Sequence, residues 1–366
     1  MVTTIDIKQV IHMKEGTDET SYAKTSYIQK QVLSLTKHIK EKAMKEFYCK
    51  NQPATLCIAD MGCSSANSLN VVFDLIVIVD KARRELGKGP QDYQIYLNDL
   101  PGNDFNTIFR SLGSFKDMLK QHLGDDFGRC YINGVPGTFY GRLFPENHLQ
   151  FVHSSYSLQW LSQVPEDIMD NKGNIYIAKT SPSNVLEAYY KQFQKDFSMF
   201  LQCRSEEVVE GGIMVLTILG RKSSELYSKE SSHMFDLLAT ALKDMVSEGF
   251  IDEDKLNTSN IPNYTPSEAE LRFLVEKEGS FVVNQIHISE VNWEADDNCE
   301  NSSKAASSHY DFVKCMRSVT EPLLINHFGE SIIEELFLRY TELVRVSMAK
   351  EKSVFINITL WLTRKG

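Results

Sequence analysis

Short apolar runs alternate with helical patterns through the first half of the chain. The apolar runs predict buried strands at 56–61, 93–97, 149–153, 174–178 and 214–219. Apolar positions that recur along one face predict helices at 71–86, 105–112 and 184–208. Strands separated by helices are typical of a mostly parallel sheet that is covered on both faces.

The texture of the sequence changes after residue 231. The patterns there predict a helix at 234–246, followed by a turn-rich stretch with Pro262 and Pro266 and a solvated polar loop at 294–309. Two more helices are predicted at 311–326 and 332–348, and a final strand at 354–362. We therefore expect an α/β sheet core with a largely helical cap inserted in its later part.

The composition is that of a globular protein, with 42% hydrophobic and 24% charged residues. A formal net charge of −10 and the lack of a long basic run argue against nucleic acid and a membrane surface as partners. The start of the chain has no apolar core of signal-peptide length, and the best candidate span, 71–79, is short and interrupted by Asp74. The seven cysteines form no CxxC pair, so we expect reduced thiols and a cytoplasmic location.

Two acids stand at the ends of successive predicted strands. Asp60 precedes the small-residue turn Gly62-Cys63-Ser64, and Asp99 ends the next strand. Ligands bind at the carboxyl ends of such strands, and a glycine lets the backbone approach a ligand closely. A carboxylate at the second strand end is the usual partner of a ribose diol, so the pair of acids predicts a nucleoside ligand.

The turn after the first strand has one glycine, Gly62, rather than a GxGxxG sequence. A pyrophosphate cradle is therefore not expected, and NAD is a weak alternative. A nucleoside without phosphates fits better. S-adenosylmethionine (SAM) is such a nucleoside, and its amino-acid end suits Asp60.

Six longer motifs carry a family resemblance. They are 12–16 (HMKEG), 21–24 (SYAK), 98–106 (NDLPGNDFN), 135–145 (VPGTFYGRLFP), 153–162 (HSSYSLQWLS) and 321–324 (EPLL). In these motifs, and over nearly its whole length, the chain resembles the plant SABATH methyltransferases, especially their salicylate and benzoate carboxyl methyltransferases.

The resemblance implies an α/β fold with a Rossmann-like class I methyltransferase sheet and a mainly helical cap. It divides the chain into an N-terminal active-site lid (1–30), a SAM-binding core (31–230), a cap with some core strands (231–352) and a final core strand (353–366). It also implies a homodimer, and it implies no metal in the methyl transfer itself.

The resemblance further implies a set of cofactor-binding residues. The set is Tyr22, Ser26, Asp60, Cys63, Asn67, Asp99, Leu100, Thr138, Phe139, Ser154 and Tyr156. Two positions depart from the family pattern. The stretch 64–67 is one residue shorter than usual, which makes the placement of Asn67 a matter of judgement, and Thr138 replaces a serine while keeping the hydroxyl.

For the substrate, the resemblance implies that Gln29 and Trp160 hold a carboxylate through their N–H groups, as the catalytic pair. The other implied substrate-binding residues are Tyr156, Gln159, Leu219, Met234, Phe235, Tyr264, Met316, Val319 and Phe355. For each apolar member taken alone, an ordinary place in the core is the simpler interpretation, and only their joint match to the family favours a binding wall.

The resemblance, together with the two strand-end acids, predicts SAM-dependent O-methylation of the carboxylate of a small, aromatic acid of the salicylate, benzoate, anthranilate or nicotinate type. A benzoate-like acid has a pKa of about 4 and is ionised near neutral pH, so no general base is needed. Alignment of the reacting atoms can supply roughly 7–11 kcal/mol.

Three alternatives stay open. The first is N-methylation of xanthine alkaloids within the same family, because Gln159 and Phe235 stand where the salicylate-type enzymes usually have Met and Trp. The second is a non-catalytic binding protein, although Asp60 and Asp99 are both intact. The third is an NAD-dependent oxidoreductase. We expect no metal, because Asn257 replaces the Asp that some family members use near a magnesium ion, and losing a carboxylate weakens such a site.

Overall fold

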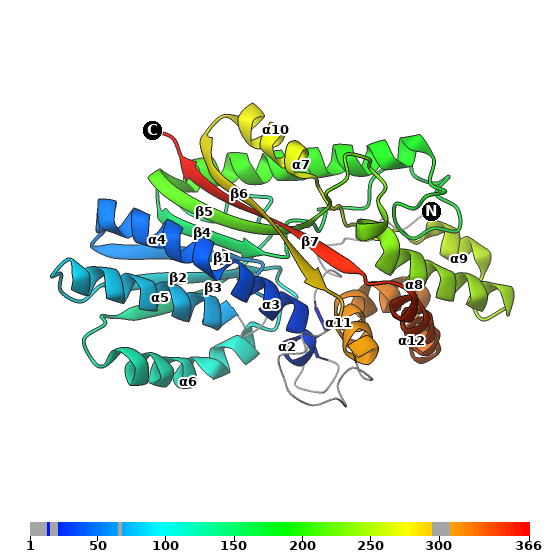
Figure 1. Ribbon diagram of the computed structural model, residues 1–366, viewed down its shortest axis with the longest axis horizontal. Helices are drawn as coiled ribbons and strands as arrows, with labels where there is room; N and C mark the ends of the chain where they lie inside the picture. The colour runs from blue at the N-terminus through cyan, green and yellow to red at the C-terminus, as the bar shows by residue number, and fades with distance from the viewer. Residues whose placement is uncertain (1–12, 15–20, 65–67, 295–307) are drawn as a thin grey trace.

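The computed structural model describes residues 13–14, 21–64, 68–294 and 308–366, and it is built around one seven-stranded sheet (Figure 1). The strand order is β3-β2-β1-β4-β5-β7-β6. The strands are β1 (Thr55–Met61), β2 (Asp92–Asp99), β3 (Cys130–Pro136), β4 (Leu149–Ser155), β5 (Val208–Gly220), β6 (Phe281–Asn292) and β7 (Val354–Arg364). The first five are parallel, and β7 runs antiparallel between β5 and β6. The expected mostly parallel α/β sheet is confirmed.

Helices cover both faces of the sheet and gather at one end of it (Figure 1). Those of the first half are α2 (Tyr22–Thr25), α3 (Tyr27–Leu35), α4 (Lys37–Asn51), α5 (Ser68–Glu85), α6 (Phe105–Leu123) and α7 (Ser183–Glu207). Those of the second half are α8 (Lys229–Ser247), α9 (Glu253–Thr258), α10 (Glu268–Glu278), α11 (Ser308–Phe328), the 3-10 helix η1 (Glu330–Ile332) and α12 (Ile333–Lys350). Figure 1 shows α8, α9, α11 and α12 packed together beyond the strands.

The two-residue alternation of strand side chains divides the buried residues into two cores. In β5, Ile213 and Val215 pack with α4, α5 and α6, whereas Met214 and Leu216 pack with α7, α8, α11 and α12. Because successive side chains in a strand point to opposite faces, a strand buried on both faces needs a continuous apolar run. The 213–219 run meets that need, which is why it was recognisable in the sequence.

Several boundaries differ from the sequence predictions. Residues 174–178 do not form a strand: they lie in a turn-rich segment whose apolar side chains, such as Ile175 and Tyr176, are buried without a ladder partner. The side-chain amide of Asn171 donates to the carbonyl of Tyr176 and holds that segment (3.2 Å). The predicted helix at 105–112 continues to Leu123.

The sequence analysis missed the helices α2, α3, α4, α9 and α10 and the strands β3 and β6. β3 and β6 are partly exposed strands in which polar residues interrupt the apolar run, and β3 also contains Gly134. The predicted polar loop at 294–309 lies largely outside the described residues, and α11 already begins at Ser308.

Register places the chemistry-bearing strand ends side by side. Asp60 of β1 is opposite Leu97 of β2 and His153 of β4, and the three strands run parallel. Their carboxyl ends therefore meet at one edge of the sheet, beside the cluster of cap helices.

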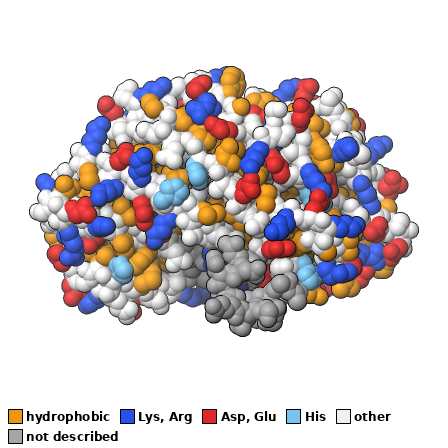
Figure 2. All heavy atoms as spheres, in the orientation of Figure 1, with side chains coloured by type: hydrophobic (Ala, Val, Ile, Leu, Met, Phe, Trp, Pro, Cys, Tyr) orange, Lys and Arg blue, Asp and Glu red, His pale blue; other side chains and the backbone are white. Residues whose placement is uncertain are grey.

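The surface shown in Figure 2 mixes Lys and Arg with Asp and Glu, and its described residues form no broad basic area. Within residues 13–14, 21–64, 68–294 and 308–366, no helix combines the length and the apolar character needed to cross a membrane.

Candidate active site

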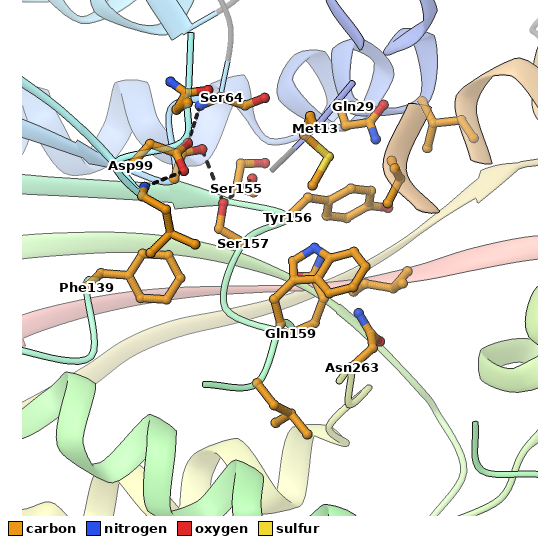
Figure 3. Close-up of a pocket in the computed structure, with 18 of the residues that line it drawn as sticks. Met13, Gln29, Ser64, Asp99, Phe139, Ser155, Tyr156, Ser157, Gln159 and Asn263 are labelled. Carbon is orange, nitrogen blue, oxygen red and sulfur yellow. Dashed lines mark hydrogen bonds between the residues drawn. The ribbon is translucent and has the colours of Figure 1, made fainter. Parts of the chain in front are cut away.

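A cavity opens at the carboxyl ends of β1, β2 and β4, between the sheet and the cap helices (Figure 3). This main cavity holds about 1190 Å³ of empty space, including the part that is open to solvent. A smaller side cavity continues from it, and Gln29, Gly62, Ser64 and Ser155 line both.

The turn after β1 requires a glycine. Gly62 has φ +76°, and a Cβ built there would lie 2.1 Å from Oγ of Ser157. The N–H groups of Gly62 and Cys63 both donate to the carbonyl of Asn98 (2.9 Å each). The side-chain amide of Asn98 in turn donates to the carbonyls of Val135 and Gly137 (2.8 and 2.9 Å). One buried asparagine thus ties the turns after β1 and β3 to the end of β2.

Asp99 is held by the backbone on both of its carboxylate oxygens. The N–H of Ser64 donates to Oδ2 and the N–H of Leu100 donates to Oδ1, each at 2.7 Å. The carboxylate lines the main cavity. The oxygens of a carboxylate on the cavity wall can accept hydrogen bonds from a ligand such as a diol.

Asp60 lies deeper, in the side cavity, and is paired with His153. Its Oδ1 is 2.7 Å from Nδ1 of His153, and both residues are less than 5% exposed. Burial lowers the pKa of His153 below the ordinary value of 6.5, against the pull of the Asp60 carboxylate. The imidazole is therefore neutral near pH 7, and its Nδ1–H donates to Asp60, whose carboxylate lines the side cavity.

The opposite end of the main cavity is lined mainly by aromatic and apolar side chains, with the amides of Gln159 and Asn263 among them. Figure 3 shows Gln159 and Asn263 at the end away from Asp99 and Ser64. Trp160 pairs with Asn263 in a short β-bridge, and both line the cavity. The side-chain oxygens Oε1 of Gln159 and Oδ1 of Asn263 are buried and have no hydrogen-bond partner among the described residues.

Gln29 comes from α3 and reaches the junction of the two cavities. Its Oε1 accepts a hydrogen bond from Sγ of Cys315 on α11 (3.7 Å). With the oxygen engaged, the amide nitrogen is the part of Gln29 that suits an anion. Tyr156 stands across the cavity with φ +58°, and its hydroxyl donates to Oδ1 of Asn357.

The comparisons with known proteins agree with one another. The family model of SAM dependent carboxyl methyltransferases matches residues 8–365. The chain is 52% identical over 369 residues to the salicylate carboxymethyltransferase of Clarkia breweri, covering 99% of this chain and 100% of that one. It is 49% identical over 361 residues to S-adenosyl-L-methionine:benzoic acid/salicylic acid carboxyl methyltransferase 3 of Petunia hybrida, covering 98% and 99%.

The chain belongs to the SAM-dependent carboxyl methyltransferases. Its fold agrees: a solved loganic acid methyltransferase with SAH superposes with a TM-score of 0.82 at 30% identity, covering 97% of this chain and 99% of that one. The resemblance seen in the sequence, the fold class, the use of SAM and the carboxyl methyltransferase activity are thereby confirmed.

The carboxyl methyltransferase fold brings most of the sequence-predicted site residues to these two cavities. Those on the main cavity are Gln29, Asp99, Leu100, Thr138, Phe139, Tyr156, Gln159, Trp160, Leu219, Met234, Phe235, Met316, Val319 and Phe355. Those on the side cavity are Ser26, Asp60 and Cys63. The side chain of Tyr22, and Asn67 as a whole, lie outside the described part of the chain.

Two predicted site residues lie elsewhere. Ser154 turns away from both cavities and its Oγ donates to the carbonyl of Met61 (2.9 Å). Side chains alternate along β4, so its neighbours His153 and Ser155 face the side cavity instead. Tyr264 is fully buried behind the wall, where its hydroxyl lies 3.2 Å from a guanidinium nitrogen of Arg221 and 3.0 Å from Oε1 of Glu270.

The sequence analysis missed further residues that line the main cavity, among them Met13, Asn103, Tyr140, Ser155, Ser157 and Asn263. Met13, Asn103, Ser155 and Ser157 lie inside motifs that carried the resemblance, so a closer reading of those motifs offered a signal. Asn263 gave none, because a single asparagine between two prolines is typical of an ordinary turn.

The charge pattern of the main cavity is simple. Among the described residues that line it, none is Lys, Arg or His, and the one acid is Asp99. A substrate carboxylate there must be held by neutral N–H groups.

In the part of the chain that the structure describes, no three His, Cys, Asp or Glu side chains come together as metal ligands, and Oδ1 of Asn257 accepts from the N–H of Gly173 (2.8 Å). The expectation that no metal takes part stays a prediction.

The neutral, buried His153 generates a prediction about pH. Unfolding restores its ordinary pKa of 6.5, so below that pH the unfolded chain binds a proton that the folded chain does not. The free energy of unfolding should therefore fall as pH drops below 6.5, with a slope approaching about 1.4 kcal/mol per pH unit from this one group. In His153→Asn, whose amide can still donate to Asp60, that part of the slope should be lost. Urea unfolding of both proteins without ligand, at pH 5.5 to 7.5, measures the difference. Equal slopes in the two proteins would contradict the assignment.

Proposed function

We propose that this carboxyl methyltransferase methylates a small aromatic acid. The observation that carries the proposal is the main cavity itself: an aromatic and apolar chamber that opens directly onto the Asp99 turn and offers neutral N–H donors at its junction. Such a chamber accepts a flat ring, and its junction accepts the carboxylate of that ring.

The cofactor half of the site is proposed as follows. Asp99 accepts the ribose hydroxyls, and Asp60, which accepts from the neutral His153, holds the ammonium of the amino-acid end. Around these two acids lie Ser26, Cys63, Leu100, Thr138, Phe139 and Tyr156, and the serine facing the ligand is Ser155 rather than Ser154. Tyr22 and Asn67 complete the set as expected from the family.

The acid half rests on Gln29 and Trp160. The amide nitrogen of Gln29 and the indole N–H of Trp160 are proposed to donate to the two carboxylate oxygens. The ring would lie between Tyr156, the cap residues Met316 and Val319, and Phe355 of β7. When bound, SAM supplies a methyl group that is already activated. The residues of this chain then need only align the carboxylate oxygen with that methyl and exclude water, without a general base.

The domain roles are proposals with structural support. Met13 lines the main cavity, the N–H of Lys14 donates to the carbonyl of Ser318 on α11 (2.8 Å), and its ammonium pairs with Glu321 (3.0 Å). These contacts support a lid within 1–30 that closes against the cap 231–352, over the core 31–230 and its final strand 353–366. A homodimer and a cytoplasmic location are proposed from the family.

N-methylation of a xanthine is the second candidate, because the unpartnered oxygens of Gln159 and Asn263 also suit a polar ring. An assay with methyl-labelled SAM against benzoate, salicylate, anthranilate, nicotinate, jasmonate and xanthines separates the two. We expect methyl esters of the aromatic acids and no transfer to xanthine. Turnover of xanthines alone would overturn the proposal.

Asp99→Asn tests the cofactor assignment. The substitution exchanges one accepting oxygen for a donor that faces a backbone N–H, so a ribose hydroxyl loses its partner. Losing a charged hydrogen bond costs about 1.5–3 kcal/mol, equivalent to a loss of roughly 10- to 100-fold in SAM affinity by calorimetry. Asp104→Asn is the control, since Asp104 caps α6 outside both cavities and Asn caps a helix equally well. Unchanged affinity in Asp99→Asn would refute the ribose role.

Gln159→Met tests whether Gln159 selects between the rings of different substrate acids. A buried amide oxygen without a partner costs about 1–3 kcal/mol, so a ring that donates to it, such as that of anthranilate, should be preferred. The ratio of kcat/KM for benzoate to that for anthranilate should rise about tenfold in Gln159→Met, or roughly 1.4 kcal/mol. Gln285→Met on β6 makes the same chemical change away from the cavities and should leave the ratio alone. The same ratio in Gln159→Met as in the parent would show that Gln159 does not read the ring.

A further inference from the structure

The last turn of α7 carries a fully buried ion pair at some remove from the ligands. A guanidinium nitrogen of Arg204 lies 2.8 Å from Oε2 of Glu207, and both side chains are 0% exposed. Neither residue lines the main or the side cavity. Burying two charges costs several kcal/mol per ion unless further hydrogen bonds satisfy them, so the partners of this pair are informative.

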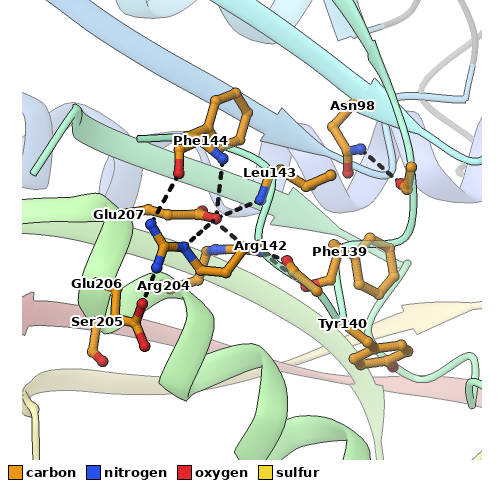
Figure 4. A network of polar contacts seen from close by, with 12 residues as sticks. Asn98, Phe139, Tyr140, Arg142, Leu143, Phe144, Arg204, Ser205, Glu206 and Glu207 are labelled. Atoms are coloured by element: carbon orange, nitrogen blue, oxygen red, sulfur yellow. Dashed lines mark hydrogen bonds and ion pairs between the residues drawn. The ribbon is translucent and has the colours of Figure 1, made fainter. Parts of the chain in front are cut away.

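The other hydrogen-bond partners of Arg204 and Glu207 are backbone groups of one segment, residues 138–144 (Figure 4). Arg204 donates to the carbonyls of Phe139 and Gly141 (2.9 and 2.8 Å). Oε1 of Glu207 accepts from the N–H groups of Leu143 and Phe144 (2.6 and 3.1 Å). The pair thus binds four peptide groups of a segment that contains neither helix nor strand.

That segment has few other means of fixing its backbone. Inside it, the N–H of Gly141 donates to the carbonyl of Thr138 (3.1 Å), the N–H of Tyr140 donates to Oγ1 of Thr138 (3.3 Å), and the side chain of Arg142 donates to the carbonyl of Phe144 (3.3 Å). Arg142 also pairs with Oε1 of Glu207 (3.5 Å), and the side chain of Asn98 holds the preceding Gly137 (2.9 Å). Buried peptide groups without partners are costly, so the ion pair takes the place that a sheet ladder has in a regular element. Arg204 also packs over the ring of Phe200, which in turn contacts Phe139.

The segment reaches both halves of the site. Thr138 and Phe139 line the main cavity beside Gly62, where the cofactor is proposed to bind. The next residue, Tyr140, also lines the cavity, and its hydroxyl donates to the carbonyl of Trp160 (2.6 Å). Trp160 is the proposed carboxylate clamp, so a single backbone segment connects the cofactor wall to the acid wall.

We propose that Arg204 and Glu207 are positioning residues that hold the segment 138–144, and that Tyr140 extends this hold to Trp160, so that one buried ion pair sets both binding walls. The acid half of the proposal rests on the proposed function, whereas the cofactor half does not. A merely structural ion pair would lower stability without a selective effect on ligand binding.

Three variants separate these possibilities. Arg204→Lys keeps the charge but cannot reach two carbonyls and Glu207 together. Tyr140→Phe removes only the hydroxyl that contacts Trp160. Glu187→Gln is the matched control, because Glu187 lies on the same helix and its ion pair with Lys191 lies at the surface, away from the segment.

The measurements are the affinity for SAH by calorimetry, the KM for the best acid and kcat at saturation. In Arg204→Lys we expect the affinity for SAH to fall about tenfold and the KM for the acid to rise similarly, with kcat within about twofold of the parent. In Tyr140→Phe the KM for the acid should rise about fivefold or more while the affinity for SAH stays at the parent value. Glu187→Gln should match the parent in all three.

Parent-like SAH affinity and KM in a folded Arg204→Lys would overturn the proposal. If that variant does not fold, Tyr140→Phe and Glu207→Gln decide. Glu207→Gln keeps the accepting oxygen but leaves Arg204 without its counter-charge, and we expect its SAH affinity to fall less than in Arg204→Lys but by at least threefold. If the protein transfers methyl to none of the acids, the proposed function is wrong. The proposal about the ion pair is still tested by the SAH measurements.

Discussion

The hydrogen bonds of Asn98 are the constraint on which the site depends. Its carbonyl accepts from the N–H groups of Gly62 and Cys63, and its side-chain amide donates to the carbonyls of Val135 and Gly137. One fully buried residue of β2 therefore holds the ends of β1 and β3, the strands on either side of it. Parallel strands bring their carboxyl ends to the same edge, but they do not fix the loops beyond. Asn98 fixes them, and Asp99 follows directly in the chain. The carboxylate of Asp99 then needs only the N–H groups of Ser64 and Leu100 to be fully oriented.

The cap adds what the sheet lacks. The sheet edge supplies acids and backbone N–H groups, whereas α8, α11 and the start of β7 supply the apolar side chains Met234, Phe235, Met316, Val319 and Phe355. The cofactor end and the acid end therefore lie on different parts of the chain. The segment around Tyr140 and the side chain of Gln29 are the places where these parts meet, and both carry hydrogen bonds across the junction.

Much of this arrangement could be predicted from the sequence, and the failures have physical causes. Asp60 and Asp99 were recognisable because a buried strand reads as an apolar run and an acid after it stands out. β3 and β6 were missed because partly exposed strands lack that run, and 174–178 was mistaken for a strand because buried irregular backbone is equally apolar. Ser154 was chosen over Ser155 because a motif does not show which face of a strand a residue takes. Tyr264 was placed in the wall, although its hydroxyl belongs to the buried Arg221 and Glu270 pair.

The lack of a cationic side chain among the described residues of the main cavity has a consequence for how the acid is held. Beside Asp99, the protein itself offers an anionic acid no opposite charge there. The positive charge that attracts the acid is the sulfonium of SAM. Methyl transfer then removes the positive charge from sulfur and the negative charge from the carboxylate at the same moment. The attraction that admits the substrate ends with the reaction, and the neutral ester leaves a site that no longer holds it by charge.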